Sequence, residues 1–252
     1  MKKVTIVIPY ILGPDNGLEL RYTLRSIEKN FRHDNYEIIV IGDKPDWLTN
    51  INHVPFTRVP VRDFRTFDDQ LMKLYVALTE CDITNDFIWT YDDTYFTSEV
   101  KLDDIKSLKA IRRIYSRNTV EDFPGGSNWK ICIMKALDDT GGKFVYETHL
   151  PRWYNKRKML TLFDKFDMLN RPTVIATLYY NYFFKDQEPQ LIEDNKDHIR
   201  FLCRSTFEPD RLEKIMRRSK FSNNNPAVWN KIFTETLQRI FPDSSKYETG
   251  PQ

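Results

Sequence analysis

VTIVIPY, residues 4–10, sets the architecture expected of this chain. It is a continuous run of apolar, mostly β-branched residues closed by Pro9 and Tyr10, which is typical of a strand covered on both faces. A loop at 11–17 follows it. The next segment carries one apolar stripe at helical spacing, made by Leu20, Leu24, Ile27 and Phe31. A buried strand followed by an amphipathic helix predicts the start of an α/β fold.

The same alternation continues for the first hundred residues. YEIIVIGD (36–43) is a second buried strand, and HVPFTRVPV (53–61) supplies a short third one. TFDDQLMKLYVAL (66–78) has the capping signal and apolar stripe of a helix. DFIWTY (86–91) is a further strand. This order predicts a mostly parallel sheet flanked by helices.

The second half has a different pattern. Helix starts are predicted at or after Asp103, Pro151, Pro172, Pro209 and Pro226. Two glycine pairs punctuate residues 123–151, which we predict to be strand and loop extending the sheet. We therefore expect residues 1–150 to form the α/β core and residues 151–252 to form a helical portion packed on it, within one continuous domain.

Composition narrows the class of protein. Hydrophobic residues make up 40% of the 252, enough for a sizeable core. Lys and Arg number 38 against 36 Asp and Glu, a net charge of +2 that neither demands nor excludes a nucleic-acid or phosphate partner. Three cysteines lie far apart without a CxxC motif, and no apolar run reaches the length of a transmembrane segment. We expect a cytoplasmic location.

Polar side chains fall where the predicted strands end. Tyr10, Asp43 and the pair Asp92–Asp93 all follow apolar runs. Because ligands collect at the carboxyl ends of parallel strands, these residues are expected to line one crevice. Adjacent carboxylates repel each other and resist burial, and a hard divalent cation offsets that repulsion. The pair therefore predicts a site for Mn²⁺ or Mg²⁺, which would also neutralise a leaving diphosphate.

FIWTYDDTYF, residues 87–96, resembles the metal-binding motif of nucleotide-sugar glycosyltransferases of the GT-A fold. The two earlier apolar runs are similar to the first two strands of that fold, in which the acid after the second strand holds the nucleoside; Asp43 matches that position. The resemblance implies a GT-A-like sheet, a UDP-sugar donor and a cation held by Asp92 and Asp93. Residues 1–150 would bind the nucleotide sugar, and residues 151–252 would form the acceptor side.

The chain also resembles the Stealth family of sugar-phosphate transferases, through blocks at 15–30, 38–48, 65–78, 87–96, 146–166, 201–215 and 237–248. It departs from that family in three places. The first strand lacks the Trp-Val-Asp-Gly signature, Tyr91 replaces an Asn, and Arg204-Ser205 stands where an Asn-Asp pair is expected. These departures fall in motifs tied to phosphotransfer, so we favour plain glycosyl transfer.

Donor binding has four candidates besides Asp43. Tyr10 begins the loop after the first strand, and Asp92 would also lie against the donor diphosphate. Arg62 and Arg65 are placed to grip a diphosphate bidentately, although loop arginines are more often solvated.

The chemical step has its own candidates within ETHLP. Glu147 is a candidate general base, with a surface acid as the alternative. His149 is a candidate metal ligand or phosphate contact, with a hydrogen bond at a helix start as the alternative. With an ordinary imidazole pKa of about 6.5, a ligating His149 would lose activity below that pH.

Trp153 and Tyr154 are candidate acceptor-binding residues, because their rings suit a stacked sugar; the alternative is a helix with one solvated face. The predicted activity is metal-dependent transfer of a sugar from a nucleotide-sugar donor to an acceptor hydroxyl. Two alternatives stay open, a Stealth-type hexose-1-phosphate transferase and a non-catalytic nucleotide-sugar or carbohydrate binding module. The acceptor is a glycan, a lipid-linked precursor or modified DNA.

Overall fold

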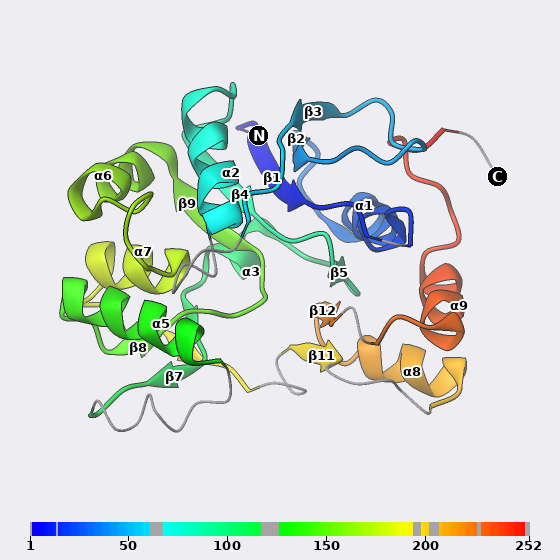
Figure 1. Cartoon of the computed structure of the whole chain (residues 1–252). Coiled ribbons are helices and arrows are strands. Elements are labelled where there is room, and N and C mark those ends of the chain that lie inside the picture. Colours follow the sequence, from blue (N-terminus) through cyan, green and yellow to red (C-terminus); the bar gives the residue numbers. More distant parts are fainter. Residues whose placement is uncertain are drawn as a thin grey trace.

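The computed structural model describes residues 2–13, 15–60, 68–116, 126–193, 198–201, 207–225 and 228–249. Within these ranges the largest sheet has the order β3-β2-β1-β4-β9 (Figure 1). Its strands are β1 (Val4–Tyr10), β2 (Tyr36–Gly42), β3 (Asn52–Pro55), β4 (Asp86–Trp89) and β9 (Arg152–Asn155). The first four run parallel, and β9 pairs antiparallel with β4. The predicted α/β class with a mostly parallel sheet is confirmed.

The two faces of β1 belong to two different cores, as the period of two along a strand requires. Ile6 and Ile8 pack with helix α1 (Leu18–Asn30) in one cluster. Val7 packs in the other cluster with α2 (Asp68–Thr79) and α6 (Lys156–Phe166). Both faces of the sheet are therefore covered, which explains why β1 is apolar at every position.

Residues 127–140 form helix α5 (Ser127–Thr140), so the prediction of strand and loop across this segment is wrong. The glycine pairs bracket the helix instead of marking loops. Gly126 is the N-cap, and Gly141 ends the helix in the left-handed region with φ of 63°. Buried residues at helical spacing form its inner face: Cys132, Ile133, Ala136 and Leu137.

The segment after Pro151 begins as strand β9 and becomes helical only at Lys156. Because β9 completes the sheet, the central sheet spans the predicted boundary at 150–151. The remaining helices are α3 (Leu102–Lys106), α7 (Ile175–Phe183), α8 (Pro209–Met216) and α9 (Lys231–Ile240). The predicted helix near Asp103 is a single short turn of five residues.

Three smaller sheets complete the described fold. One has the order β11-β12-β5 and contains β5 (Thr94–Phe96), β11 (Ile199–Phe201) and β12 (Phe221–Asn224). The other two pair β6 (Lys109–Ala110) with β10 (Gln190–Leu191), and β7 (Arg112–Arg113) with β8 (Phe144–Val145). Through β5, which closely follows β4, the first of these joins the carboxyl end of the central sheet to the C-terminal part of the chain (Figure 1).

A bidentate ion pair fastens the C-terminal segment to α1. Arg25 donates through Nε and Nη2 to the two carboxylate oxygens of Glu248, at 2.8 and 2.7 Å. Both side chains are buried, with 8% and 3% exposed. The described helices include none with the length and apolarity needed to cross a bilayer.

Candidate functional site

The ends of β1 and β2 are held against each other where the predicted donor residues lie. The Asp43 carboxylate accepts a 2.7 Å hydrogen bond from the backbone of Leu12, which fixes the loop after β1. Gly42 has a φ of +135°, and a Cβ there would lie 1.9 Å from the carbonyl oxygen of Tyr10. The buried Lys73 donates to the same carbonyl at 2.8 Å. Glycine is therefore required at Gly42, and Asp43 is presented at the strand end.

Asp92 and Asp93 occupy the turn between β4 and β5. The carbonyl of Asp92 accepts a 2.6 Å hydrogen bond from the Thr23 hydroxyl on α1. The carboxylate of Asp93 accepts from the side-chain amide of Asn223 on β12, at 3.4 Å. The acid pair is therefore positioned from both halves of the chain, by α1 and by β12.

Burial and electrostatic repulsion raise the pKa values of the acidic side chains in this turn. Burial and the neighbouring charges of Asp93 and Glu19 raise the pKa of Asp92 well above its ordinary value. Burial raises the pKa of Asp93 to about 6, against the lowering effect of its hydrogen bond from Asn223. Burial and the charges of Asp92, Asp15 and Asp43 also raise the pKa of Tyr10. Asp92 and Asp43 thus both lie within electrostatic reach of Tyr10, as expected for residues at neighbouring strand ends.

Glu19, Asn223 and Asn224 belong to this site and were missed at the sequence level. Asn224 donates to Glu19 at 2.6 Å and accepts from the hydroxyl of the fully buried Tyr95 at 2.7 Å. Burial raises the pKa of Glu19 to about 7, with Asp93 and Asp15 adding to the shift. The signal available was FSNNN (221–225), a polar run after an aromatic residue. Nothing local in it indicates pairing with β5.

His149 contacts the two residues that flank the acid pair: its ring lies 5.8 Å from that of Tyr91, and its carbonyl accepts from the Thr94 hydroxyl at 3.5 Å. Burial lowers the pKa of its imidazole to about 3, and the positive groups Arg200, Arg152 and His198 add to the effect. The ring is therefore neutral at physiological pH. Its cationic surroundings favour an anion next to the imidazole over a metal cation.

Glu147 forms two structural contacts. One carboxylate oxygen accepts from the backbone of Thr177 in the first turn of α7, at 2.9 Å. The other lies 3.5 Å from the guanidinium of Arg152. The buried Arg152 also donates to the Tyr91 hydroxyl at 2.7 Å and to the Thr148 carbonyl. Glu147 thus caps α7 and neutralises Arg152.

The predicted acceptor residues lie away from this crevice. Tyr154 is fully buried in the core with α2 and α6, so its ring has no face for a sugar. Trp153, on the edge strand β9, is the register partner of Ile88 and lines a different cavity, near the amino ends of β1 and β4. Alternation along β9 explains the result, because neighbouring strand residues point to opposite faces. Arg62 and Arg65 lie outside the described residues.

Over the described ranges, no three His, Cys, Asp or Glu side chains are grouped so as to hold a metal ion. The site offers instead the two carboxylates of Asp92 and Asp93 and the amide oxygen of Asn223. That oxygen is buried without a hydrogen-bond partner in this part of the chain. Oxygen donors of this kind are the ligands that Mg²⁺ and Mn²⁺ prefer.

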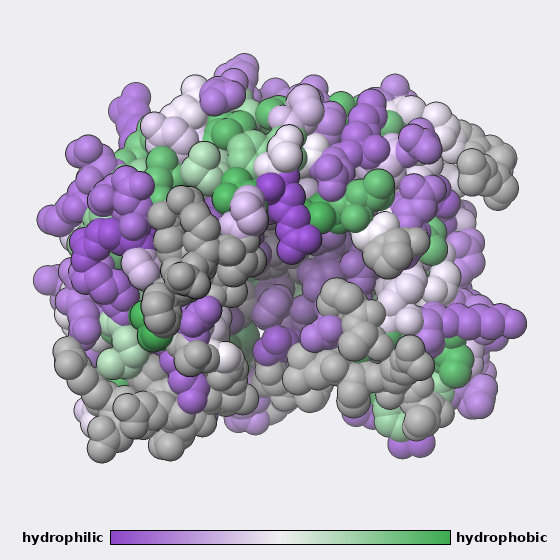
Figure 2. All heavy atoms as spheres, in the orientation of Figure 1, coloured by the Kyte–Doolittle hydropathy of each residue, from purple (hydrophilic) through white to green (hydrophobic). Residues whose placement is uncertain are grey.

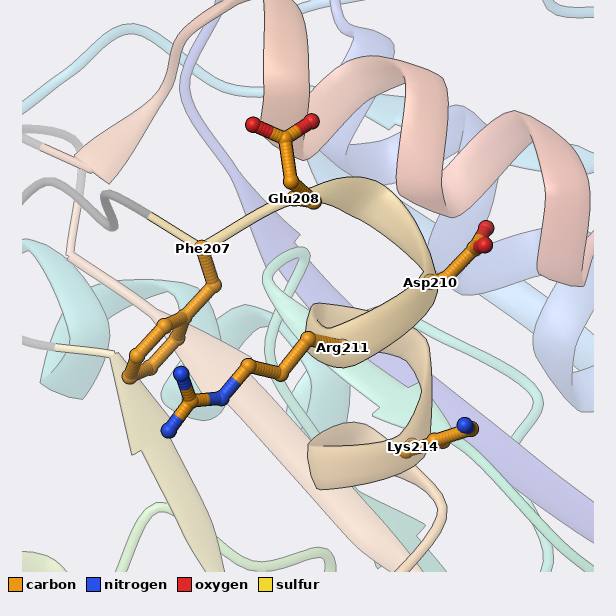
Figure 3. Close-up of a pocket in the computed structure, with 5 residues that line it drawn as sticks. All are labelled: Phe207, Glu208, Asp210, Arg211 and Lys214. Carbon is orange, nitrogen blue, oxygen red and sulfur yellow. The ribbon is translucent and has the colours of Figure 1, made fainter.

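The surface at the centre of this face is hollowed and polar. Figure 2 shows hydrophilic residues gathered around a hollow between the end of β1 and the β11–β12 strands. A different cavity of about 560 Å³ lies at the start of α8, where the guanidinium of Arg211 is 4.3 Å from the ring centre of Phe207 (Figure 3). None of the residues lining that cavity is a predicted site residue, so we place the candidate site in the central hollow.

Comparisons with known proteins bear on the fold. No family model and no curated protein matches the sequence. The chain is similar to the solved structure of the bifunctional glycosyltransferase WbbM, with a TM-score of 0.52, 10% identity, and coverage of 96% of this chain and 50% of that one. The chain thus spans half of WbbM and shares its fold there, which confirms the GT-A-like architecture.

Two other solved structures are similar at lower scores. The galactosyltransferase LgtC, in complex with donor and acceptor sugar analogs, has a TM-score of 0.48, 11% identity, and coverage of 99% of this chain and 98% of that one. A glycosyltransferase involved in glycosylation of the major capsid of PBCV-1 has a TM-score of 0.42, 10% identity, and coverage of 95% and 98%.

Proposed function

We propose that this chain is a metal-dependent glycosyltransferase that moves a sugar from a UDP-sugar donor to an acceptor hydroxyl. One observation carries the proposal. The carboxyl ends of parallel strands on a glycosyltransferase-like fold present a half-buried, mutually repelling pair, Asp92 and Asp93, of which Asp92 lies within electrostatic reach of Tyr10. Burying two carboxylates side by side is costly, and a divalent cation bridging them to a diphosphate offsets that cost.

The donor would lie along the strand ends. Asp43 would bind the nucleoside, and Tyr10 would lie next to Asp43. The diphosphate would lie against Asp92 and Asp93. Asp92 and Asp93, with the buried amide oxygen of Asn223, would hold Mn²⁺ or Mg²⁺. Mg²⁺ sites commonly use one or two carboxylates and complete the shell with water and substrate phosphates, so a site without three acidic or His ligands fits this role. The bound cation would neutralise charge developing on the leaving diphosphate.

The residues around His149 suit the leaving group itself. A neutral imidazole near Arg152 and Arg200 can donate a hydrogen bond to a phosphate oxygen, and the neighbouring guanidiniums stabilise its charge. In the transfer step an acceptor oxygen attacks the anomeric carbon while the bond from that carbon to the donor phosphate breaks. We therefore assign His149 to the phosphate and keep metal ligation as its second proposed role.

The acceptor proton needs a base. Glu147 was the sequence candidate, and its carboxylate is engaged by Arg152 and Thr177. Glu19 is the candidate that the structure adds, because its pKa of about 7 lies near the working pH of a general base. We propose Glu19 as the base, with Glu147 as a positioning residue for Arg152.

Two other functions are separable by experiment. A Stealth-type transferase would direct the acceptor at phosphorus, so the product would retain one phosphate and gain the corresponding mass. A binding module would bind donor and release no nucleotide with any acceptor. The acceptor classes remain a glycan, a lipid-linked precursor or modified DNA, and none has a described site that singles it out.

The deciding experiment is a thermal-shift screen of nucleotide sugars with and without Mn²⁺. A donor at 100 times its dissociation constant should add about 2.7 kcal/mol to the free energy of unfolding. We expect a UDP-sugar to stabilise the protein in the presence of Mn²⁺ and much less in EDTA. Equal stabilisation in EDTA would remove the metal from the proposal, and no stabilisation by any nucleotide sugar would remove the donor.

A further inference from the structure

A second cavity, of about 470 Å³, lies at the opposite end of the sheet from the candidate site. Val4 and Asp86, the first residues of β1 and β4, line it. The same strands end at Tyr10 and Trp89, next to the acid pair. The cavity is therefore separated from the proposed transfer site by the length of β1, and it can be tested independently of that site.

Positive charge is concentrated around this cavity. Five cationic side chains line it, Lys2, Lys3, Arg32, Lys101 and Lys106, together with the carboxylate of Asp86. Asp86 is already engaged, by Lys2 at 3.4 Å and by the amide of Asn155 at 2.7 Å.

Nearby acids balance part of the remaining charge. Glu37 lies 2.8 Å from Lys3, and Glu99 lies 3.4 Å from Arg32 and 3.6 Å from Lys101. Five cations thus face three carboxylates. The side chains of Lys2 and Lys101 are 76% and 68% exposed, so their ammonium groups are free to turn toward a ligand.

Lys106 contributes a positive charge next to the indole of Trp153, which forms one wall of the cavity. Its ammonium lies 5.0 Å from the ring centre of Trp153. In the part of the chain that the structure describes, no carboxylate lies within ion-pair distance of it. The indole is half-buried and packs against the core around α1, so it forms a firm apolar wall beside the charge.

We propose that this cavity binds the phosphate groups of an anionic ligand. A phosphate brings the negative charge that the excess cations lack, and lysine ammonium groups bind phosphate as point charges. Trp153 and Leu102 offer an apolar wall to the organic part of the ligand, and the volume lies within the usual range for ligand cavities. The phosphates belong either to a small phosphorylated molecule or to a phosphodiester chain, which present the same chemistry to the lysines.

The test is fluorescence anisotropy of a labelled twelve-residue oligothymidylate (dT12), with the full chain tagged at its C-terminus so that Lys2 stays unobstructed. The double variant Lys101→Glu/Lys106→Glu is compared with Lys143→Glu/Lys231→Glu. The control changes the net charge equally at exposed positions away from the cavity. Lys106→Gln is measured alongside, because it removes one charge without reversing it. Circular dichroism checks that each variant is folded.

We expect at least tenfold weaker binding in the cavity variant and less than a twofold change in the control. The slope of log affinity against log salt should fall by about 1.4 when two phosphate contacts are lost. If inorganic tripolyphosphate displaces dT12 at concentrations similar to those at which dT12 binds, the ligand is a small phosphorylated molecule. If tripolyphosphate fails to displace dT12, the ligand is a phosphodiester chain. Equal losses in the cavity and control variants, or no binding of either probe by the wild-type protein, would overturn the proposal.

Discussion

The side-chain amide of Asn223 lies 3.4 Å from the carboxylate of Asp93, although 130 residues separate them in the chain. The contact follows from strand pairing, because Asn223 on β12 is the register partner of Thr94 on β5. The next residue, Asn224, holds Glu19 from the same strand. A single β-strand from the C-terminal part of the chain thus arranges the polar groups around the acid pair.

Asp93→Asn is expected to reduce turnover by ~100-fold or more, because it removes a charged oxygen from the proposed cation site. In EDTA at pH 8 its midpoint of thermal unfolding should rise. The fold raises the pKa of Asp93 to about 6, so the ionised form costs stability above that pH, and the neutral amide avoids the cost. Nucleotide release and circular dichroism measure the two effects. Asp164→Asn, at an exposed position, is the control. Full activity of the wild-type protein in excess EDTA would refute the proposal that turnover depends on a metal ion.

Asp43→Ala is expected to raise the Michaelis constant for the donor about 10- to 100-fold and to change kcat less. Contacts to the nucleoside are shared by the ground and transition states, and a hydrogen bond to a charged group contributes about 1.5–3 kcal/mol. The same change frees the backbone of Leu12. Steady-state kinetics with Asp46→Ala, an exposed acid in the following loop, as control checks the result. An unchanged Michaelis constant for the donor would count against the role of Asp43 in nucleoside binding.

His149 gives a pH dependence whose sign can be stated. Its folded pKa of about 3 lies below the ordinary 6.5. Between these values the unfolded chain binds a proton that the folded chain does not, so stability falls as pH falls below 6.5. Without metal, wild-type protein should lose roughly 1–2 kcal/mol more than His149→Gln between pH 7 and pH 5, measured by urea unfolding.

The activity of the wild-type enzyme should not fall at pH 6.5 through His149, because burial keeps the ring neutral there; this corrects the threshold expected from an ordinary imidazole. His149→Ala should lower turnover on the order of 100-fold if the ring contacts the leaving phosphate. A destabilised variant with unchanged turnover would remove His149 from the site.

Glu19→Gln and Glu147→Gln form a matched pair that separates the base from the positioning residue. Glu19→Gln keeps an oxygen for Asn224 and should abolish turnover with stability retained or increased. Glu147→Gln leaves the buried Arg152 without its countercharge and should cost about 3 kcal/mol of unfolding free energy. Chemical denaturation and nucleotide release on both variants give the answer. An active Glu19→Gln together with a stable, inactive Glu147→Gln would reverse the two roles.

Glu248→Ala is expected to destabilise the protein by about 3–5 kcal/mol, because the buried Arg25 loses its bidentate partner. Burial raises the pKa of Glu248, but the hydrogen bonds from Arg25 and Ser245 outweigh it, and the net pKa is lowered. The contribution of the pair should therefore be fully present above the unfolded pKa of Glu248 and be lost as pH falls through its lower folded pKa. Glu235→Ala, which breaks an exposed pair with Lys231, should cost less than about 0.5 kcal/mol in the same melts.

The sequence predicted the elements whose signal is local. Continuous apolar runs located β1, β2 and β4, and the topology of parallel strands then indicated that Asp43 and the acid pair lie near one another. Helix α5 was mistaken because glycine pairs end helices as readily as they form loops. Strand β9 was missed because its four residues follow a proline and precede a helix, and with it the burial of Tyr154.

The long-range contacts had no local signal. Asn223 reaches the site because β12 pairs with β5, and the polar run around Asn223 is equally compatible with a surface loop. The neutral state of His149 likewise depends on its burial and on Arg200, which is distant in the chain. Such features depend on tertiary pairing and not on the pattern of neighbouring residues.

The late position of β9 has a consequence for biosynthesis. Asp86 on β4 finds its partner Asn155 only 69 residues later. At translation rates of about 5–20 residues per second, the nascent chain carries β4 with an unpaired edge for several seconds. Open apolar edges promote association between chains, and charged residues beside them act as gatekeepers. Asp92 and Asp93, which follow β4 directly, would thus protect the growing polypeptide from aggregation before β9 covers that edge.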